Sequence, residues 1–393
     1  MRQRVITFLK FHPRIINIFW KCARFVFQVW GIFVPVRNTM LFASFGGRKY
    51  DDSPKAIYDE VCKRAEFDDW ELIWVFVNPD DIDISRGKKI KVDTFEFFYA
   101  LLYSKVWVSN SGMDRGIGLQ RKKTIKVETW HGAPLKKIGE DQNQNVLGGK
   151  KNKKVSVDTT TIRCAQSEFD RDIFARVFHA SKECFLLSDL PRNDALFKYD
   201  DNQLLEIRKQ LGIAKDKKVI LYTPTYREYL VNEDKNTYLL LPMNFDKWRQ
   251  KLGDKYVLLI RAHYAVSTAL NLKNDDFVKD VSAYPTLNDL YVVADMMISD
   301  YSSTFFDYSI LCRPIFCYAY DLEEYKEKRG LYSDLKEILH CTIDVTEDEL
   351  IEHILNLDDK KAILETEKFH KKYTPNAGYA SEMVVNEIVR KLL

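Results

Sequence analysis

Short apolar runs alternate with amphipathic segments along most of this chain, a pattern typical of a parallel β-sheet covered by helices. In the first half, the buried strands are predicted at residues 40–45, 72–77, 106–109, 125–129, 162–165 and 184–187. Helices are predicted at 53–65, where Ser53-Pro54 is a start signal, and at 94–103. Strands and helices that alternate in this way predict an α/β domain with helices on both faces of its sheet.

The alternation restarts after a polar helix at 203–211, which ends at Gly212. Further strands are predicted at 219–222, 256–260, 296–298 and 315–318, and the last helices at 347–369 and 378–392. We therefore predict two Rossmann-like α/β domains that face a cleft. The predicted parts are an N-terminal segment (1–37), a first domain (38–205), a second domain (206–370) and a final helix (371–393) that packs back on the first domain.

The first 37 residues follow a different pattern, in which aromatic and aliphatic residues interleave with basic ones. Residues 1–50 contain no Asp or Glu, whereas Lys and Arg recur throughout them. No uncharged window reaches the about 20 residues that a membrane span needs, and no signal-peptide pattern is present. We predict a basic amphipathic segment that lies in the headgroup plane of an anionic membrane. A helix packed on the protein's own surface is the alternative.

Length and composition give further information on the number of domains, the partners and the compartment of the protein. The 393 residues exceed one ordinary core, in agreement with two domains. The formal charge is +3, but the basic N-terminus leaves the remainder mildly acidic, so nucleic acid is not predicted as a partner. Seven cysteines without a CxxC pair indicate reduced thiols in a cytoplasmic protein. The triplet Asp81-Ile82-Asp83 lies far from the other motifs, and we predict no cofactor and no obligatory metal.

The segment TWHGAPLKKIGED (129–141) follows the predicted strand at 125–129. Its His131 comes just past a strand end, where open α/β sheets bind ligands, and Gly132 allows a close approach of the backbone. An imidazole at this place can act as a general base near neutral pH, and a purely structural histidine is the alternative. Pro134 suits the first turn of a following helix. Glu140 and Asp141 either orient His131 or are simply solvated.

Three further strand ends carry polar residues. The strands at 219–222, 256–260 and 296–298 lead to Thr225 and Arg227, to Arg261 and His263, and to Ser299, Asp300, Ser302 and Ser303. Arg261 can bind a phosphate in a bidentate manner. The two serines at 302 and 303 precede a predicted helix, whose free amides and dipole favour an anion; helix capping alone is the alternative. Because these strand ends belong to one sheet, we predict a phosphate site there.

Taken together, these segments resemble the CDP-glycerol glycerophosphotransferase family of teichoic acid synthesis. The resemblance rests on WHGAPLKKIGED, PRND (191–194), YTPTYRE, RAH and ISDYSSTFFDYSILCRPIFCYAYD, and it covers residues 38–390. It implies a GT-B-like fold and a peripheral position on the cytoplasmic face of the cell membrane. It also implies transfer of a polyol phosphate from a CDP-activated donor to a hydroxyl of a lipid-linked acceptor, with release of CMP.

The resemblance assigns expected roles to single residues. His131 is expected as the catalytic base and His263 as a second catalytic histidine near the donor phosphates. The expected donor-binding residues are Thr225, Arg227, Arg261, Ser299, Asp300, Ser302, Ser303 and Arg313. The expected acceptor-side residues are Gly132, Lys136, Lys137, Glu140 and Asp141. Tyr226 and Ala133 stand where the family often has Trp and Thr, which leaves the acceptor open.

The resemblance thus implies transfer of glycerol phosphate from CDP-glycerol to a polyprenyl-diphosphate-linked disaccharide, in synthesis of wall teichoic acid or a related polyol-phosphate polymer. Addition of a single unit is favoured over polymerisation, because the chain adds only the basic segment to its two domains. The alternatives are a CDP-ribitol enzyme or capsule polymerase of the same family, a GT-B glycosyltransferase that uses a nucleotide sugar, and an inactive membrane scaffold. The sequence does not define an oligomeric state.

Overall fold

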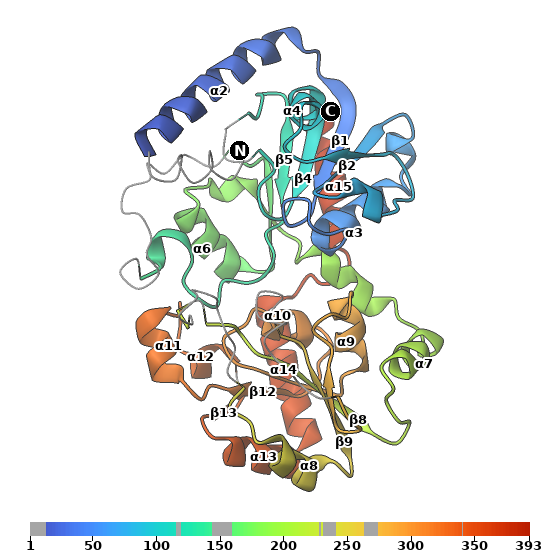
Figure 1. Ribbon diagram of the computed structural model, residues 1–393, viewed down its shortest axis with the longest axis vertical. Helices are drawn as coiled ribbons and strands as arrows, with labels where there is room; N and C mark the ends of the chain where they lie inside the picture. Colours follow the sequence, from blue (N-terminus) through green and yellow to red (C-terminus); the bar gives the residue numbers. More distant parts are fainter. Residues whose placement is uncertain are drawn as a thin grey trace, which may run out of the picture.

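The computed structural model describes residues 13–114, 119–143, 159–227, 229–230, 241–262, 274–339 and 341–393. Two parallel sheets form the body of the protein, one above the other in Figure 1, and helices cover both faces of each. The predicted α/β class is therefore confirmed. None of the seven cysteines takes part in a disulfide bond.

The first sheet is built by the N-terminal half of the chain. Its described strands are β1 (Arg37–Ala43), β2 (Glu71–Phe76), β3 (Lys88–Lys91), β4 (Ser104–Ser109), β5 (Ile125–Glu128), β6 (Ile162–Ala165) and β7 (Phe185–Leu187), in the order β3-β2-β1-β4-β5-β6-β7. Helices α3 (Asp52–Val61), α4 (Phe95–Tyr103) and α6 (Glu168–Val177) pack on it. Val106, Trp107 and Val108 are all buried, because helices cover both faces of the central strands.

The second sheet is built by the C-terminal half. Its described strands are β8 (Lys218–Thr223), β9 (Tyr256–Ile260), β10 (Val278–Asp280), β11 (Met296–Ser299), β12 (Ile315–Tyr318) and β13 (Ile343–Asp344), in the order β10-β9-β8-β11-β12-β13. The helices around it are α7 (Asp201–Gln210), α8 (Phe245–Leu252), α9 (Leu287–Val293), α10 (Thr304–Ser309), α11 (Leu322–Lys328) and α12 (Leu335–Leu339). The strand order reverses between β8 and β11, which is where open sheets of this kind bind ligands.

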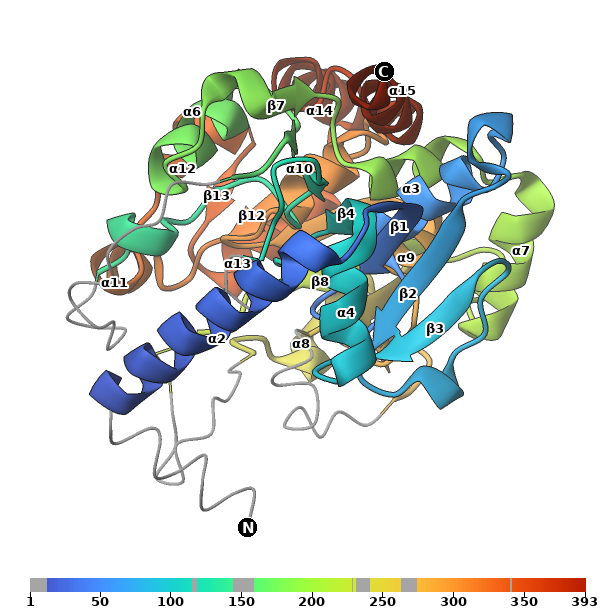
Figure 2. The same cartoon turned by 90° about the horizontal axis from the view of Figure 1, so that it is seen from above.

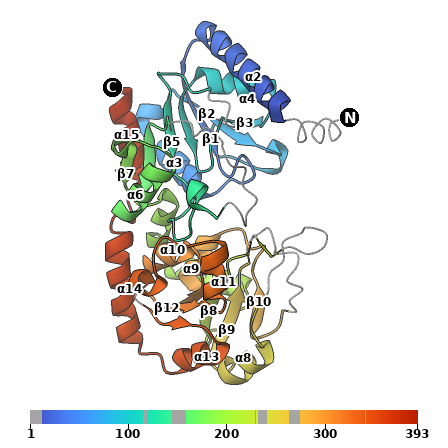
Figure 3. The same ribbon diagram turned by 90° about the vertical axis from the view of Figure 1, so that its left-hand side faces the viewer.

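The C-terminal helices correct one prediction. The single helix expected at 347–369 is two helices, α13 (Glu347–Leu355) and α14 (Asp359–Tyr373). The break occurs because the Asp358 side chain caps α14, accepting a hydrogen bond from the Lys361 amide at 3.1 Å. The last helix, α15 (Ala380–Leu392), buries Val384 and Ile388 in the core of the first sheet, and Figure 3 shows it beside that sheet while α14 runs along the second. The exact domain limits stay a prediction.

The helix α2 (Pro13–Phe33) packs against α4, and Figure 2 shows its C-terminal end beside α4. Phe27 contacts Phe98 at 5.1 Å between ring centroids, and Trp30 stacks on Tyr99 at 5.4 Å. Within the described part of the chain, no helix is long and apolar enough to cross a bilayer. The helix is thus attached to the first sheet through its aromatic residues. Residues 1–12 of the predicted membrane segment lie outside the described residues.

Candidate active site

His131 lies just past β5 on a sharply turned backbone. Trp130 and Gly132 on either side of it have φ values of 57° and 151°, in the left-handed region. The Trp130 indole stacks on the imidazole with ring centroids 4.3 Å apart, and the His131 side chain is exposed. The His131 Nδ1 atom lies 3.0 Å from the carbonyl oxygen of Asn110. Because a carbonyl only accepts, the neutral ring carries its proton on Nδ1 and keeps a lone pair on Nε2.

The surroundings of His131 also favour the neutral ring. Desolvation by the protein around it lowers the pKa of His131 below its usual 6.5, although the hydrogen bond to Asn110 and the negative charge of Asp52 act in the opposite direction. The positive charges of Arg192 and Lys136 lower it further. Near pH 7 the imidazole is therefore unprotonated at Nε2, which is the state that a general base requires.

The segment after His131 corrects one further expectation. Pro134 does not begin a helix; the chain instead runs extended to η3 (Gly139–Asp141). The reason is pairing with the second half of the protein, since the Lys137 amide donates to the Gly330 carbonyl at 3.0 Å and Lys136 forms an antiparallel bridge with Leu331. These two lysines, expected on the acceptor side, thus lie where the two halves join.

Glu140 and Asp141 do not orient His131. The Asp141 carboxylate pairs with Arg176 at 2.7 Å and accepts a hydrogen bond from the Tyr332 hydroxyl, also at 2.7 Å. Glu140 contacts His179 at 3.3 Å instead. The group that fixes the ring of His131 is therefore the Asn110 carbonyl, at the end of the neighbouring strand β4.

Arg227, which follows β8, is completely enclosed. Its guanidinium pairs with Asp300 at 3.0 Å and with Asp321 at 2.8 Å, and its side chain is 1% exposed. Burial alone would lower the pKa of Arg227, but the two carboxylates raise it, so the guanidinium is charged. Asp300 also accepts a hydrogen bond from the Thr225 amide at 3.0 Å. Arg227, Thr225 and Asp300 thus hold the loops after β8 and β11 together.

The serines after β11 divide into a buried and a less buried group. Ser299 is buried, and its hydroxyl donates to the Thr223 carbonyl at 2.7 Å. Ser302 accepts a hydrogen bond from the Thr304 amide at 3.2 Å, as a capping residue does. Ser303, at the N-cap of α10, makes no side-chain capping bond. Helix capping therefore does not account for the presence of a serine at position 303.

The loop of His131 and the turn of Ser303 meet, although they belong to different sheets. A Cβ atom on Gly132 would lie 2.3 Å from the Ser303 Oγ atom. No side chain larger than hydrogen fits at Gly132 without movement of Ser303, which explains the glycine beside the histidine. The predicted base and the predicted phosphate turn are thus neighbours.

The remaining donor-side residues lie in different places. Arg261 donates to the Tyr284 carbonyl at 2.6 Å, and burial lowers its pKa. His263 lies outside the described residues. Arg313 precedes β12, at the amino edge of the sheet, and donates to the carbonyls of Val292 and Ala294 at 2.7 and 2.6 Å. Arg313 is therefore apart from the strand ends that carry the other residues.

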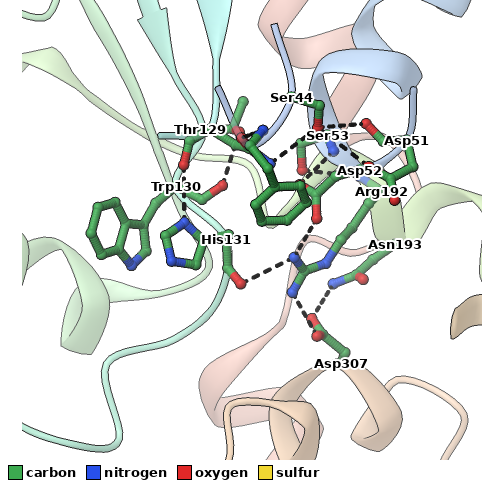
Figure 4. A network of polar contacts seen from close by, with 12 residues as sticks. Ser44, Asp51, Asp52, Ser53, Thr129, Trp130, His131, Arg192, Asn193 and Asp307 are labelled. Carbon is green, nitrogen blue, oxygen red and sulfur yellow. Dashed lines mark hydrogen bonds and ion pairs between the residues drawn. The ribbon is translucent and has the colours of Figure 1, made fainter. Parts of the chain in front are cut away.

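Sequence reasoning missed a charged network next to His131. Arg192, noted only as part of the PRND match, donates to the His131 carbonyl at 3.1 Å. Its guanidinium also pairs with Asp52 at 2.8 Å and with Asp307 at 2.7 Å (Figure 4). Burial would raise the pKa of Asp52, but Arg192 and the Ser53 amide lower it. A lone aspartate in the apolar run TFFDYSIL was the available sequence signal for Asp307.

Two parallel sheets whose carboxyl edges carry His131 and a hydroxyl-rich turn are the arrangement of a GT-B-like fold. The chain matches over residues 26–390 the family described as CDP-glycerol:poly(glycerophosphate) glycerophosphotransferase, and it belongs to that family. The predicted family, GT-B-like fold and enzyme class, a CDP-glycerol glycerophosphotransferase of teichoic acid synthesis, are thereby confirmed.

Individual relatives support the assignment. The chain is 34% identical over 340 residues to a teichoic acid glycerol-phosphate transferase of Staphylococcus aureus, a match that covers 83% of this chain and 85% of the relative. It is 36% identical over 335 residues to a teichoic acid poly(glycerol phosphate) polymerase of Staphylococcus epidermidis, and there the match covers 82% of this chain but only 46% of the relative. The chain thus spans about half of that polymerase.

A solved structure covers nearly all of the chain. The wall teichoic acid polymerase TagF, in a histidine-to-asparagine form soaked with CDPG, superposes with a TM-score of 0.81 at 30% identity. The superposition covers 99% of this chain and 98% of that one. The arrangement of the two sheets is therefore that of TagF.

Proposed function

We propose that this enzyme transfers glycerol phosphate from CDP-glycerol to a hydroxyl of a polyprenyl-diphosphate-linked disaccharide and releases CMP. One observation carries the proposal: His131, held at Nδ1 by Asn110 and unprotonated at Nε2, neighbours the turn of Ser303 through Gly132. A base beside a phosphate turn is what transfer of a phosphoryl group to a hydroxyl requires. The TagF form soaked with CDPG supports the choice of CDP-glycerol.

In the proposed reaction the acceptor hydroxyl oxygen attacks the phosphorus that bears glycerol, in line with the departing CMP. The bond from that phosphorus to the acceptor oxygen forms while its bond to the CMP oxygen breaks. His131 Nε2 takes the hydroxyl proton, an effect that is typically worth about 10²- to 10⁴-fold in rate. CMP leaves with the bonding electron pair.

The negative charge that develops on the phosphoryl oxygens needs donors at fixed positions. We assign this role to the hydroxyls of Ser302 and Ser303, to Arg261 and to His263. Arg261 suits it because its guanidinium is partly buried, and its described contact is a carbonyl rather than a carboxylate. Arg227 and Asp300 act one step further away, by holding the turn that presents the serines.

The membrane contact is also part of the proposal. The face of α2 turned away from α4 exposes Phe25, Ile32 and Phe33, with exposed fractions of 67%, 74% and 78%. Lys21 and Arg24 on the same helix are exposed as well. An apolar face beside basic residues suits the headgroup layer of an anionic membrane, where a lipid-linked acceptor would lie. We therefore place the enzyme on the cytoplasmic membrane face.

The number of units added is a separate question. Both a polymerase and a glycerol-phosphate transferase are similar to this chain, so single addition stays a prediction. One assay both answers this question and tests the proposed reaction. CMP release from CDP-glycerol is measured with and without a lipid-linked disaccharide, in the native enzyme and in His131→Ala.

We expect acceptor-dependent release that falls about 10²- to 10⁴-fold in His131→Ala. His353→Gln is the matched control, because this partly exposed histidine on α13 pairs with Asp344 of the edge strand β13, which is two strands away from β11. One glycerol phosphate per acceptor would define single addition, and many would define a polymerase. Release from CDP-ribitol alone, or turnover of a nucleotide sugar alone, would overturn the choice of donor.

A further inference from the structure

Arg192 lies in η5 (Pro191–Phe197), a short helical segment between the two sheets. Its guanidinium contacts three groups from three separate parts of the chain. They are the Asp52 carboxylate of α3 at 2.8 Å, the His131 carbonyl at 3.1 Å and the Asp307 carboxylate of α10 at 2.7 Å. The first two belong to the first half of the protein and the third to the second half, so one side chain bridges both (Figure 4).

The charges of this bridge are enclosed by protein. The side chains of Arg192, Asp52 and Asp307 are 16%, 9% and 2% exposed. One cation is thus shared by two buried carboxylates, and loss of either contact would leave a buried charge without compensation. The fork of the guanidinium suits the task, since its N–H groups reach several acceptors at fixed angles, which an ammonium group does not.

The segment that carries Arg192 is itself fixed on both sides. On the first half, the Arg192 amide donates to the Ser53 hydroxyl at 3.3 Å, and Asp194 accepts from the Ser381 amide of α15 at 2.7 Å. On the second half, the Asn288 side chain of α9 donates to the Arg192 carbonyl at 2.8 Å. Arg192 therefore has little freedom to follow a movement of only one half.

The contacts form a closed path around the active site. Asp307 lies four residues after Ser303, which is about one turn of helix. Ser303 touches Gly132, the residue after His131, and the His131 carbonyl contacts Arg192. A displacement of Asp307 would thus move the Ser303 turn, and a displacement of Arg192 would move the base.

The geometry points to Arg192 as a positioning residue, which holds the backbone of His131 at a fixed separation from the donor turn through its pairing with Asp307. The inference rests on the proposed function of His131 and adds what keeps the base in place. It explains why a buried charged network spans the two halves at this point. A misplacement of about 1 Å at a reacting group can cost about 10²-fold in rate, so small shifts at this bridge matter.

The kinetic test uses Arg192→Lys and Asp307→Asn in the full enzyme. We expect kcat for acceptor-dependent CMP release to fall about 10- to 100-fold in each. The KM for CDP-glycerol should change less than about threefold, because the displaced groups, His131 and the Ser303 turn, act on the proton and the charge that move during transfer. The double variant should lose little more than either single one, since both break the same link. Arg249→Lys is the matched control: Arg249 also bridges two carboxylates, Asp246 and Asp275, but on the exposed helix α8.

A second measurement does not depend on activity. Amide hydrogen exchange is followed in residues 130–137 and 302–309 of the native enzyme and of both variants. We expect exchange to accelerate in both segments together, with β1 unchanged. Acceleration in one segment only, additive losses in the double variant, or a raised KM with unchanged kcat would overturn the positioning role. If the native enzyme released no CMP from CDP-glycerol, the proposed function would fail, and the exchange data would still decide whether Arg192 couples the two segments.

Discussion

His131 and Arg227 occupy the same kind of position in the two sheets, a few residues past the carboxyl end of a parallel strand, but their surroundings are opposite. The ring of His131 is exposed, with one nitrogen held by Asn110. The guanidinium of Arg227 is enclosed by Asp300, Asp321 and three tyrosine rings. The end of a strand brings a polar residue to the site. A residue whose polar atoms are free to meet a substrate can take part in the reaction, whereas a residue whose polar atoms all have protein partners stabilises the structure.

The largest effect is expected for Arg227→Met. Removal of the cation leaves the buried Asp300 and the largely buried Asp321 without an opposite charge, and we expect the free energy of unfolding to fall by about 3–5 kcal/mol. Urea unfolding measures this loss, and His131→Ala, a substitution at an exposed residue, should change it by only about 0.5 kcal/mol. A stable Arg227→Met enzyme whose KM for CDP-glycerol rises sharply would show instead that Arg227 binds the donor directly.

A smaller effect is expected for Gly132→Ala, which tests the contact between the base loop and the donor turn. The new Cβ would meet Ser303 Oγ at 2.3 Å, on a backbone with a φ of 151°. We expect a loss of about 1–3 kcal/mol in the free energy of unfolding. Part of this loss should return in the double variant Gly132→Ala/Ser303→Gly, because the clash with the serine is then absent. Equal losses in the single and double variants would argue against the contact.

The sequence predicted the parts of the fold that depend on apolar runs. The strands at 256–260 and 315–318 were predicted with their observed limits, because strands covered on both faces are almost entirely hydrophobic. The short edge strand β3 (KKIK) was missed, because its polar composition carries no such signal. Helices α13 and α14 were merged, because the break between them contains neither Gly nor Pro.

The site was predictable only in part, because local sequence does not show which distant residues lie together. His131 and Ser303 stand at strand ends, which local sequence can indicate. The partners that define the remaining roles are far apart in the chain: Arg192 and Asp307 are separated by 115 positions, and Arg227 and Asp321 by 94. The spacing of these residues in the sequence does not indicate that they pair. Only the folded structure could therefore show that the guanidinium of Arg227 is fully paired and that Arg192 bridges the two halves.

The role of His131 as the base is tested by the pH dependence of the first transfer step. The surrounding protein lowers the pKa of His131 below 6.5, so the base is unprotonated above that pKa and is lost as the pH falls through it. We therefore expect kcat/KM to be constant near neutral pH and to fall about tenfold per pH unit below an apparent pKa lower than 6.5. This acid limb should be absent from the residual activity of His131→Ala. An acid limb that persists unchanged in that variant would assign the proton transfer to another group.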